Sequence, residues 1–486
     1  MERKAGTAVK PGETELARQL EYIRAIRAEN DAFAAENGRK KKFYSLAMGC
    51  QMNAHDSEKL EGMLDEMGFD RTDEETEADF IIYNTCCVRE NAEQKVYGKL
   101  GWLKHYKETK NPDAVIALCG CMMQQETVLQ TLRQKYRHVD IVFGTFNLYK
   151  LPELVATRME SGETVYDIWQ EQREVVEDLP AIRHFPYKAS VNIMFGCNNF
   201  CSYCIVPYVR GPERSRNMDG IVAEAAELAE HGIREIMLLG QNVAAYGLDG
   251  VPPPIADDNS PFAELLERIS AIDGIRRIRF TSPHPAFFNR KLIETIARLP
   301  KVCKCIHLPL QSGSDRILRR MNRPYDSAHY MNIINSLRAL VPGINFSTDI
   351  IVGFPGETEE DFEATRRIMR EAAYDNAFIF KYSPRKGTVS SKMADDVPQE
   401  EKERRNDVLL KDLAAINEFK NNELVGQTFE VLAEGPSKRN PARWSGRTDT
   451  FKLVVFTPAD GLKPGDFINV RIERATPMTL YGTIEQ

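Results

Sequence analysis

Three cysteines lie within eight residues, at Cys197, Cys201 and Cys204, directly after an apolar run at 191–195. Their C-x3-C-x2-C spacing suits an iron-sulfur cluster, which cysteine thiolates hold. A structural zinc site would normally close with a fourth ligand, and no further Cys or His lies near this stretch. With three thiolates on a cubane cluster, one iron stays free of protein and can bind a chelating substrate. The stretch therefore predicts a cluster that takes part in chemistry.

Length and composition narrow the class of protein. A chain of 486 residues suggests about three domains, and 42% apolar residues are enough to form several cores. No apolar run reaches the roughly 18 to 20 residues of a membrane span, and residues 1–10 are charged rather than signal-like. Ten cysteines, several of them clustered, favour metal ligation in a reducing compartment over a disulfide framework. We therefore expect a cytoplasmic protein that does not associate with membranes.

The first part of the chain alternates strands and helices. Residues 1–40 form an N-terminal extension with a helical pattern at 15–35, either a frayed terminus or a docking arm. In a domain at 41–159, strands are expected at 43–47, 80–84, 115–118 and 141–143, each followed by a helical stretch. This order predicts a parallel sheet with helices on both faces and with functional groups at the carboxyl ends of its strands.

A second set of three cysteines follows the first three of these strands. Cys50, Cys86 and Cys121 each come just after one strand. Because the carboxyl ends of neighbouring parallel strands meet at one edge, the three thiols can converge and hold another cluster with an open iron. Scattered buried cysteines are the alternative interpretation, since Cys is often a core residue. Further thiols at Cys87 and Cys119 leave two of the ligand positions open on spacing alone.

The middle of the chain repeats the strand and helix rhythm. Residues 162–186 are charged and poorly periodic, which predicts a linker. Six strands are then expected at 191–195, 235–239, 277–281, 305–309, 347–352 and 377–382, with helices at 219–231, 261–272, 290–299 and 359–373. This pattern predicts a partial barrel over 183–416. Polar and glycine-rich segments follow several of these strands, where the functional site of such a barrel lies.

The last part of the chain predicts a small β domain at 419–485, after a charged helix at 399–423. Its strands are expected at 428–433, 451–456 and 467–474. The net charge of −7 gives no general attraction to nucleic acid, so RNA binding needs local basic patches. A basic loop around Trp444 offers charge for phosphates and a surface for stacking; its basic residues are Lys438, Arg439, Arg443 and Arg447.

Two further arginine groups are candidates for phosphate contact. Arg210, Arg214 and Arg216 follow the C-x3-C-x2-C stretch, and a second group lines a helical segment at 316–323. A solvated helix face is the alternative for the second group. The first group lies nearer the cysteines in sequence and is the stronger candidate.

Several segments carry a resemblance to known families. The C-x3-C-x2-C stretch, with Tyr203 before its last cysteine, resembles the radical S-adenosylmethionine (SAM) superfamily. G-C-Q-M-N, N-T-C-x-V-R-E-N-A and G-C-M-M-Q resemble the cysteine motifs of the methylthiotransferase N-terminal domain. L-L-G-Q-N, T-S-P-H-P, H-L-P-L-Q-S-G-S and D-I-I-V-G-F-P-G-E resemble the radical SAM core of that family, and the end of the chain resembles a TRAM domain.

The resemblance implies an α/β protein with an N-terminal parallel sheet domain, a partial (βα)6 radical SAM barrel and a C-terminal TRAM β-barrel. It implies two 4Fe-4S clusters. An auxiliary one would be held by Cys50, Cys86 and Cys121, with Cys86 and Cys121 chosen over their neighbouring thiols, and a SAM-binding catalytic one by Cys197, Cys201 and Cys204. The residues implied to contact SAM or substrate are Gly240, Gln241, Asn242, Ser282, His284, Gln311, Ser312, Gly353 and Glu357.

By the same resemblance, the enzyme adds a methylthio group to C2 of N6-dimethylallyladenosine beside the anticodon of tRNA. One SAM would supply the radical and another the methyl group. The segments at 49–53 and 84–92 favour this branch over siblings that act on threonylcarbamoyladenosine in tRNA or on an aspartate of a ribosomal protein. A non-catalytic iron-sulfur RNA-binding regulator is the alternative from another class. Expected partners are the tRNA, a reductant protein such as flavodoxin or ferredoxin, and a sulfur donor; a monomer is expected.

Overall fold

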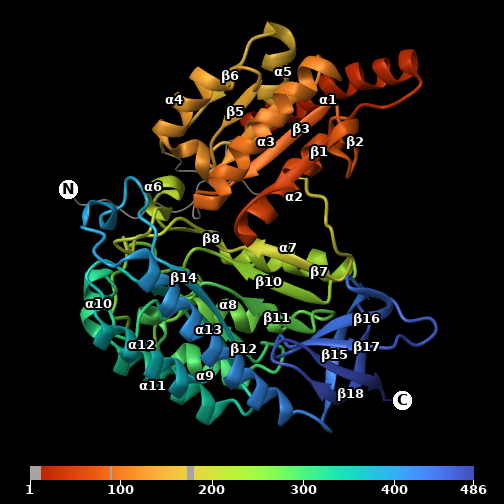
Figure 1. Ribbon diagram of the computed structural model, residues 1–486. Helices are drawn as coiled ribbons and strands as arrows, with labels where there is room; N and C mark the ends of the chain where they lie inside the picture. The colour runs from red at the N-terminus through yellow and green to blue at the C-terminus, as the bar shows by residue number, and fades with distance from the viewer. Residues whose placement is uncertain (1–12, 88–89, 172–179, 486) are drawn as a thin grey trace. The chain divides into compact units, whose positions relative to one another are not determined.

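The computed structural model describes residues 13–87, 90–171 and 180–485, and the chain divides into two compact units. The first comprises residues 1–184, 195–198 and 205–214, and the second comprises 185–194, 199–204 and 215–486. Parts of the expected N-terminal extension (1–12), of the second cysteine motif (88–89) and of the expected linker (172–179) lie outside the described residues. Figure 1 labels the elements of both units.

The first unit is built on a six-stranded parallel sheet with the order β2-β1-β3-β4-β5-β6. Its central strands are buried on both faces, as expected for a parallel sheet between two helix layers. The strands are β1 (Lys42–Ala47), β2 (Asp70–Arg71), β3 (Phe80–Thr85), β4 (Val115–Gly120), β5 (Ile141–Phe143) and β6 (Val165–Asp167).

Helices cover both faces of this sheet (Figure 1). One core contains apolar residues of α3 and α4, and the other contains residues of α1, α2 and α5. The helices are α1 (Glu13–Asn37), α2 (Gln51–Glu66), α3 (Glu90–Thr109), α4 (Glu126–Lys135), α5 (Leu151–Ser161) and α6 (Val206–Arg210), with short 3-10 turns η1 (Glu75–Glu77), η2 (Cys121–Gln124) and η3 (Leu148–Lys150). The predicted parallel sheet with two helical layers is confirmed.

Two segments of the first unit differ from the sequence interpretation. Helix α1 packs against α2 and α5 and shares a core with them through the buried Ile23 and Ile26, and Arg18 pairs with Glu153 of α5, so residues 13–37 are neither frayed nor a free arm. The expected linker contributes the edge strand β6. With only three residues, Val165–Asp167, this strand is too short to be recognised from the sequence.

The second unit contains a core of two three-stranded parallel sheets, with the orders β11-β10-β7 and β12-β13-β14. A parallel bridge between Ile278 and Val302 links the two sheets, so the strands form a partial barrel. The strands are β7 (Lys188–Asn192), β8 (Met194–Phe195), β9 (Arg214–Ser215), β10 (Glu235–Leu239), β11 (Arg277–Phe280), β12 (Cys305–His307), β13 (Asn345–Val352) and β14 (Asn376–Lys381). The first core strand begins and ends earlier than the expected 191–195, because its pairing with β10 starts at Lys188.

The core helices begin at clear capping residues. Ser260, Asp326 and Thr358 each accept a hydrogen bond from a backbone amide of the first turn, which satisfies a donor that the helix itself leaves unpaired. The helices are α7 (Met218–Glu230), α8 (Pro261–Ser270), α9 (Arg290–Arg298), α10 (Asp315–Arg320), α11 (Ser327–Leu340), α12 (Glu359–Ala372) and α13 (Gln399–Asn422), with 3-10 turns η4 (Val243–Ala245), η5 (Pro285–Phe287) and η6 (Ser390–Lys392). None of the helices in the described part of the chain is long and apolar enough to cross a membrane.

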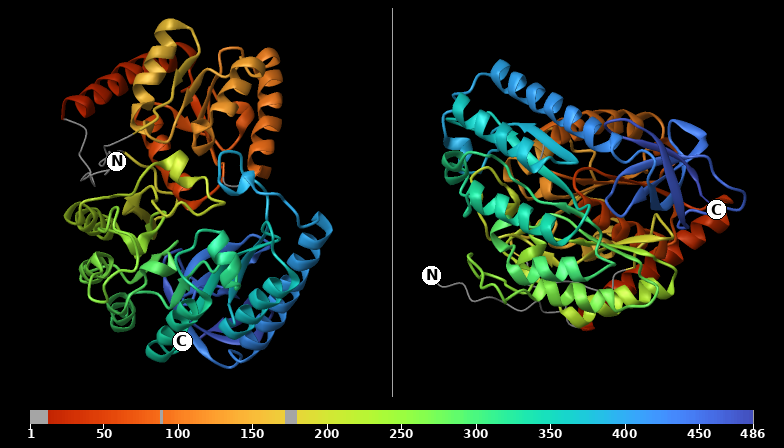
Figure 2. Two further views of the ribbon diagram at one scale, coloured as in Figure 1. Left: turned by 90° about the vertical axis from the view of Figure 1, so that its left-hand side faces the viewer. Right: turned by 90° about the horizontal axis from the view of Figure 1, so that it is seen from below.

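The chain ends in a closed five-stranded barrel with the order β15-β16-β17-β19-β18 (Figures 1 and 2). Its strands are β15 (Thr428–Ser437), β16 (Asn440–Thr448), β17 (Leu453–Phe456), β18 (Phe467–Ala475) and β19 (Leu480–Ile484). The predicted small β-barrel is confirmed. The residues expected in a basic loop instead form the turn after β15 and the strand β16. Because Arg443 and Arg447 lie on β16, its segment was interpreted from the sequence as a basic loop and not as a strand.

Two buried arginines of the core hold this barrel. Arg277 donates to the backbone carbonyls of Arg447 and Glu430 at 2.8 and 3.0 Å. Arg279 donates to the carbonyls of residues 448 and 449 at 2.8 and 3.0 Å. Both arginines lie on β11, and each is at most 4% exposed. These main-chain acceptors join the barrel to the core together with side-chain contacts, among them the ion pairs of Arg276 with Glu430 at 2.6 Å and of Lys188 with Glu434 at 2.9 Å.

Candidate active site

The cysteines at three neighbouring strand ends of the first unit come together. Cys50 caps α2 after β1, Cys86 follows β3, and Cys121 begins η2 after β4. The sulfurs of Cys50 and Cys121 lie 3.4 and 3.9 Å from one atom, the side-chain oxygen of Asn53. A Cβ added to Gly49 would lie 2.7 Å from the sulfur of Cys86. The shared edge of the three strands therefore gathers the predicted auxiliary ligands.

A buried arginine joins this group. The Nε atom of Arg210 donates to the sulfur of Cys121 at 3.2 Å, and its Nη2 atom lies 2.8 Å from the side-chain oxygen of Asn53. The same guanidinium pairs with Asp56 at 2.9 Å. A positive charge beside a thiol favours the thiolate, which is the form that ligates iron.

The three arginines that follow the C-x3-C-x2-C stretch do not form a phosphate-binding surface. Arg210, Arg214 and Arg216 are only 5%, 7% and 8% exposed. Arg216 pairs with Glu224 at 2.7 Å. The prediction that this group meets phosphates is wrong, because a basic run in sequence does not reveal that buried partners surround it.

The extra thiols differ in their surroundings. A hydrogen bond with Cys87 and the charge of Arg210 lower the pKa of the Cys121 thiol to about 6. Cys119 packs in the other core of the sheet, where burial raises the pKa of its thiol. Cys121 is therefore well suited to act as a thiolate ligand. Cys119 is buried on the opposite face of the sheet from Cys121 and is less suited to this role. The choice between Cys86 and Cys87 stays a prediction, since Cys87 also adjoins Cys121.

These residues suit a cluster better than a single ion. Within residues 13–87, 90–171 and 180–485, no three His, Cys, Asp or Glu side chains surround a position for one metal ion. The thiolates of a cubane cluster each bind a different iron, so they need not meet at one point. Three thiols at one sheet edge and a guanidinium that offsets negative charge fit such a group.

The second set of cysteines lies on the loop after β8. Gly196 has a φ of +76°, and a Cβ there would lie 2.0 Å from a backbone carbonyl oxygen, so glycine is required for this close approach. Cys197 belongs to the first unit, and its amide donates to the carbonyl of residue 211 at 3.1 Å. Cys201 and Cys204 belong to the second unit, where the amide of Cys204 donates to the carbonyl of Cys201 at 2.9 Å.

The part of this loop in the second unit is anchored on residues 320–323. The amide of Ser202 donates to the carbonyl of residue 321 at 2.9 Å, and Asn322 donates to the carbonyl of Phe200 at 3.0 Å. Phe200 has a φ of +46°, which is uncommon for a residue with a side chain. The Nη1 atom of the buried Arg323 lies 3.3 Å from the sulfur of Cys201. A phosphate role for Arg323 is therefore wrong as well.

The predicted SAM-contacting residues lie beyond the carboxyl ends of four core strands. Two of them, Ser282 and Gln311, have φ values of +60° and +69°. A strained backbone at a residue other than glycine is held by its surroundings and is concentrated at functional sites. By strand, the residues are Gly240, Gln241 and Asn242 after β10, Ser282 and His284 after β11, Gln311 and Ser312 after β12, and Gly353 and Glu357 after β13.

Buried polar atoms without a protein partner lie at these strand ends. The Nδ1 atom of His284 accepts from the amide of Ala286 at 3.2 Å, so the proton of the neutral ring is on Nε2. Burial lowers the pKa of His284, which keeps the ring neutral. Within the described chain, its Nε2 and the side-chain nitrogen of Asn242 are buried without a hydrogen-bond partner. Both donors are available to a bound ligand.

Asn192 was not identified from the sequence as a site residue. It ends β7, is 1% exposed, and both polar atoms of its side chain lack a partner among the described residues. Asn192 falls inside the strand expected at 191–195, and its polar side chain in an apolar run is the only sequence signal that could have identified it as a site residue. A fully buried and unpaired amide at the carboxyl end of a barrel strand belongs with the other ligand-facing groups.

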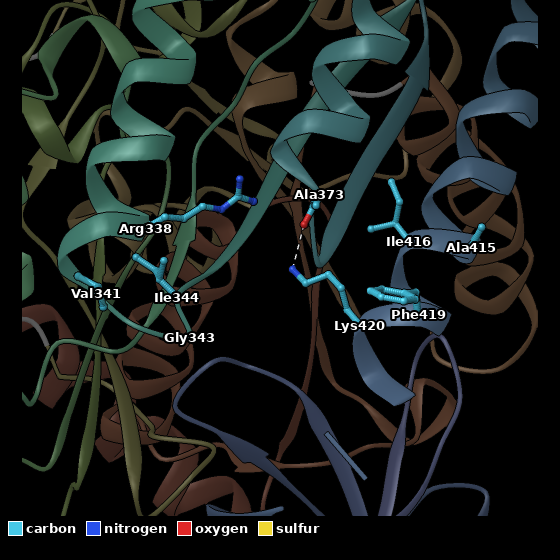
Figure 3. Close-up of a pocket in the computed structure, with 9 residues that line it drawn as sticks. All are labelled: Arg338, Val341, Gly343, Ile344, Ala373, Ala415, Ile416, Phe419 and Lys420. Carbon is cyan, nitrogen blue, oxygen red and sulfur yellow. Dashed lines mark hydrogen bonds between the residues drawn. The ribbon is translucent and has the colours of Figure 1, made fainter. Parts of the chain in front are cut away.

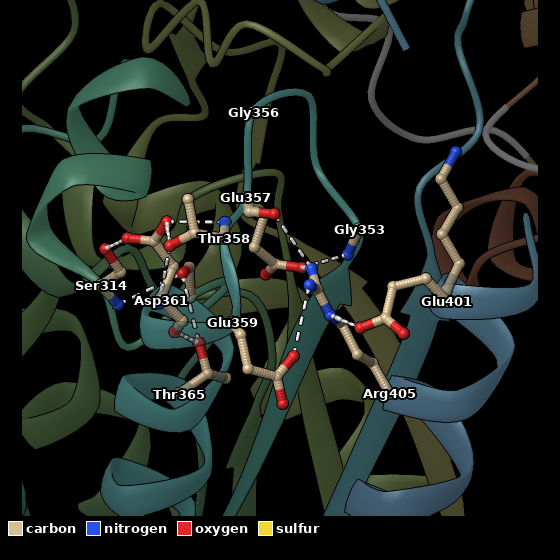
Figure 4. Close-up of polar contacts among 12 residues, drawn as sticks. Ser314, Gly353, Gly356, Glu357, Thr358, Glu359, Asp361, Thr365, Glu401 and Arg405 are labelled. Atoms are coloured by element: carbon tan, nitrogen blue, oxygen red, sulfur yellow. Dashed lines mark hydrogen bonds and ion pairs between the residues drawn. The ribbon is translucent and has the colours of Figure 1, made fainter. Parts of the chain in front are cut away.

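Glu357 mainly stabilises the structure around it through hydrogen bonds with neighbouring residues (Figure 4). Its Oε2 atom accepts from the amide of Gly353 at 2.5 Å and from Arg405 of α13 at 2.7 Å. Thr358 and Asp361 then form a capping box at the start of α12. The carboxylate therefore holds the loop between β13 and α12 in shape. In the described chain its Oε1 atom is buried and unpaired, so one acceptor remains for a ligand.

Comparisons with known proteins agree with this geometry. Three family models match in succession: "Uncharacterized protein family UPF0004" at 42–144, "Radical SAM superfamily" at 191–369 and "TRAM domain" at 422–484. The tRNA-2-methylthio-N(6)-dimethylallyladenosine synthase of Acetivibrio thermocellus is 48% identical over 470 residues, which are 97% of this chain and 96% of the relative. That of Alkaliphilus oremlandii is 47% identical over the full length of both chains. The chain belongs to the tRNA-2-methylthio-N(6)-dimethylallyladenosine synthase family.

This membership confirms the resemblance drawn from the cysteine motifs and the strand-end segments. SAM and two iron-sulfur clusters are the cofactors of this synthase family. Among solved structures, the radical SAM methyltransferase TsrM from Kitasatospora setae is similar, with 14% identity and a TM-score of 0.49 over 70% of this chain and 75% of that one.

The four basic barrel residues that were predicted to bind RNA fall into two groups. Lys438, Arg439 and Arg443 are exposed around the turn between β15 and β16. Arg447 stacks on Phe451 with its guanidinium carbon 4.2 Å from the ring centroid, and it donates to the carbonyl of that residue. The exposed group is free to meet phosphates, whereas Arg447 also supports the barrel.

A pocket of about 630 Å³ opens at the amino ends of β13 and β14 in the synthase-family core (Figure 3). Apolar residues of α13, among them Phe419, and of the segment after α11 line it together with Arg338 and Lys420. Both cations point to the end of α12, where Lys420 donates to the carbonyl of Ala373 at 2.9 Å and Arg338 to that of residue 371. Both cations offset the negative carboxyl end of α12. The pocket lies at the amino ends of the strands, so it is distinct from the site at their carboxyl ends.

Proposed function

We propose that the chain converts N6-dimethylallyladenosine beside the anticodon of tRNA to its 2-methylthio derivative, with one SAM as the radical source and one as the methyl donor. Relatives at 47–48% identity over essentially full length carry the name of this activity. The observation that carries the proposal is the convergence of Cys50, Cys86 and Cys121 at one sheet edge, in a chain that also has the C-x3-C-x2-C stretch. The first set would supply the ligands for the second of the two iron-sulfur clusters that the synthase family uses.

In this proposal, residues 41–159 hold the auxiliary cluster, 183–416 form the radical SAM core and 419–485 bind RNA. Cys50, Cys86 and Cys121 would hold one 4Fe-4S cluster, and Cys197, Cys201 and Cys204 the other. When bound, the core cluster would supply the electron that cleaves SAM to methionine and a 5′-deoxyadenosyl radical, and the auxiliary cluster would present the sulfur atom that a second SAM methylates. Arg210 and Asn53 keep the Cys121 sulfur oriented and charged.

The protein's own groups orient the reactants. Within the described residues, His284 Nε2 and the amide nitrogens of Asn242 and Asn192 are buried donors without a protein partner, and each favours a ligand acceptor. Ligand acceptors of this kind are the carboxylate and ribose hydroxyls of SAM. Since a primary carbon radical reacts with nearby C–H bonds, the substrate must be held close and other C–H groups kept away. These donors fix the position of SAM for that purpose.

The partners follow from the chemistry. The exposed group Lys438, Arg439 and Arg443 would contact tRNA phosphates. A reductant protein such as flavodoxin or ferredoxin would supply electrons, and a sulfur donor would restore the transferred sulfur. We propose a monomer that acts in the cytoplasm, where reduced thiols and tRNA are both present.

Separate loss of the two cysteine sets tests the proposal. Anaerobically reconstituted enzyme is given dithionite, SAM and tRNA carrying N6-dimethylallyladenosine, and 5′-deoxyadenosine and methylthio nucleoside are measured by mass spectrometry. Cys50→Ala/Cys86→Ala/Cys121→Ala should cleave SAM without forming the methylthio nucleoside. Cys197→Ala/Cys201→Ala/Cys204→Ala should form neither product. Undiminished methylthio product from either variant would overturn the proposal.

A substrate panel separates this branch from its siblings. The same enzyme is offered tRNA carrying adenosine, N6-dimethylallyladenosine or N6-threonylcarbamoyladenosine, and the ribosomal protein. An apolar contact of one methylene contributes roughly 1–3 kcal/mol to discrimination, so the dimethylallyl tRNA should react much faster than unmodified tRNA. Preference for the threonylcarbamoyl tRNA or the ribosomal protein would assign the chain to a sibling branch. Tight tRNA binding without any product would favour the non-catalytic regulator.

A further inference from the structure

In each cysteine set, a buried arginine donates to a sulfur. Arg210 Nε lies 3.2 Å from the sulfur of Cys121, and Arg323 Nη1 lies 3.3 Å from the sulfur of Cys201. The two arginines are 5% and 8% exposed. Each contact lies within one compact unit, the first in the sheet domain and the second in the core. Because a guanidinium stays charged at all ordinary pH values, each site includes a permanent positive charge.

The two charges are compensated differently. Arg210 pairs with Asp56 at 2.9 Å, and both side chains are about 5–6% exposed, so Asp56 offsets part of the charge that Arg210 presents to the sulfurs. The other partners of Arg323 are neutral: the hydroxyl of Tyr325 at 3.0 Å and the carbonyl of Pro309 at 3.3 Å. In the part of the chain that the structure describes, Arg323 has no ion pair with a carboxylate.

Charge beside a cluster changes how readily it accepts an electron. Reduction adds one negative charge to the cluster, and a nearby positive charge or hydrogen-bond donor stabilises the reduced form more than the oxidised form. The effect is large in a buried site, because little solvent screens it. An uncompensated arginine therefore raises the reduction potential more than an arginine whose charge an aspartate partly offsets.

We propose that Arg323 raises the reduction potential of the cluster on Cys197, Cys201 and Cys204, while the Arg210–Asp56 pair leaves the auxiliary cluster harder to reduce. This inference rests on the cluster assignment in the proposed function. A one-electron reductant then reduces the cluster that cleaves SAM in preference to the one that holds the sulfur. Arg323 is a positioning and tuning residue that acts through Cys201.

Redox titrations of each cluster alone test this inference. The core cluster is studied in the Cys50→Ala/Cys86→Ala/Cys121→Ala background and the auxiliary cluster in the Cys197→Ala/Cys201→Ala/Cys204→Ala background. Iron and sulfide are measured first, and the reduced cluster is then followed by electron paramagnetic resonance at set potentials without SAM. The readout is a midpoint potential, which does not depend on turnover.

In the first background, Arg323→Met should lower the reduced-to-oxidised ratio at a fixed potential at least tenfold, a midpoint shift of about 59 mV for one electron. Arg323→Gln keeps a neutral donor and should shift the midpoint less, in the same direction. Arg320→Met, three residues earlier at the end of α10, is the matched control, since Arg320 donates to the carbonyl of Pro355. An unshifted potential in a loaded Met or Gln variant, or an equal shift in the control, would overturn the role of Arg323.

In the second background, Asp56→Asn exposes the charge of Arg210 and should raise the auxiliary midpoint by a similar amount. Glu58→Gln, on the same helix, removes a carboxylate that pairs with Arg183 and should leave the midpoint unchanged. An unshifted midpoint in Asp56→Asn would overturn the compensation by Asp56. Iron loss beyond one cluster in the cysteine backgrounds would contradict the cluster assignment itself, so failure of the proposed function is distinguishable from failure of the tuning.

Discussion

Replacing Gly49 by alanine should empty the auxiliary site and leave the second cysteine set loaded. Gly49 has a φ of +120°, and a Cβ there would lie 2.3 Å from the Cβ of Cys86 and 2.7 Å from its sulfur. Ordinary contact begins at 3.4 Å, so Cys86 would have to retreat by about 1.1 Å at Cβ and about 0.7 Å at sulfur. Metal-ligand distances vary by only about 0.2 Å. The displaced thiol therefore can no longer complete the ligand set.

The assay measures iron and sulfide per chain after anaerobic reconstitution. Gly49→Ala should retain about half of the wild-type iron, as Cys86→Ala should, because one of two 4Fe-4S clusters is lost. Gly101→Ala is the matched control, since Gly101 lies in α3 of the same unit and an added Cβ would meet nothing within 4 Å. A full iron content in Gly49→Ala, with half in Cys86→Ala, would refute the reasoning, because Cys86 would then ligate iron without the close approach of Gly49.

Two further outcomes follow from described contacts. Arg405→Met should lower the free energy of unfolding of the core by about 3–5 kcal/mol, because the carboxylate of Glu357 loses its cation and its side chain is only 1% exposed. Chemical denaturation measures this change, and a loss below about 1 kcal/mol would contradict the expectation. Replacing Lys438, Arg439 and Arg443 together by alanine should weaken tRNA binding and reduce the slope of log K against log salt by about 2–3. Binding measured at several salt concentrations decides this, and an unchanged slope would speak against a phosphate role.

The sequence was informative where local order dictates geometry. Strand and helix alternation predicted the parallel sheet, and the position of one cysteine after each of three strands predicted that Cys50, Cys86 and Cys121 meet. A parallel sheet places the carboxyl ends of neighbouring strands together, so position along the chain is enough. The same rule placed Asn242 and His284 at the core strand ends.

The sequence was uninformative where a residue's partner is distant in the chain. Arg210 meets Cys121, 89 residues away, and Arg323 meets Cys201, 122 residues away. In sequence both belong to basic runs, which are typical of solvated or phosphate-binding surfaces. Only packing shows that they are buried beside thiols. Strand β16 was missed for a related reason, because Arg443 and other charged side chains on its outer face conceal the alternation.

The docking of the C-terminal barrel has a consequence for how such enzymes diversify. Arg277 and Arg279 bind backbone carbonyls of residues 430 and 447–449, and a carbonyl is present whatever side chain stands at those positions. Residues 447–449 can therefore change side chain during evolution without losing these hydrogen bonds. Glu430 and Lys452 are constrained instead, because their side chains pair with Arg276 at 2.6 Å and with Asp375 at 2.7 Å. A barrel exchanged from a relative should seat on this core if it keeps these two ion pairs.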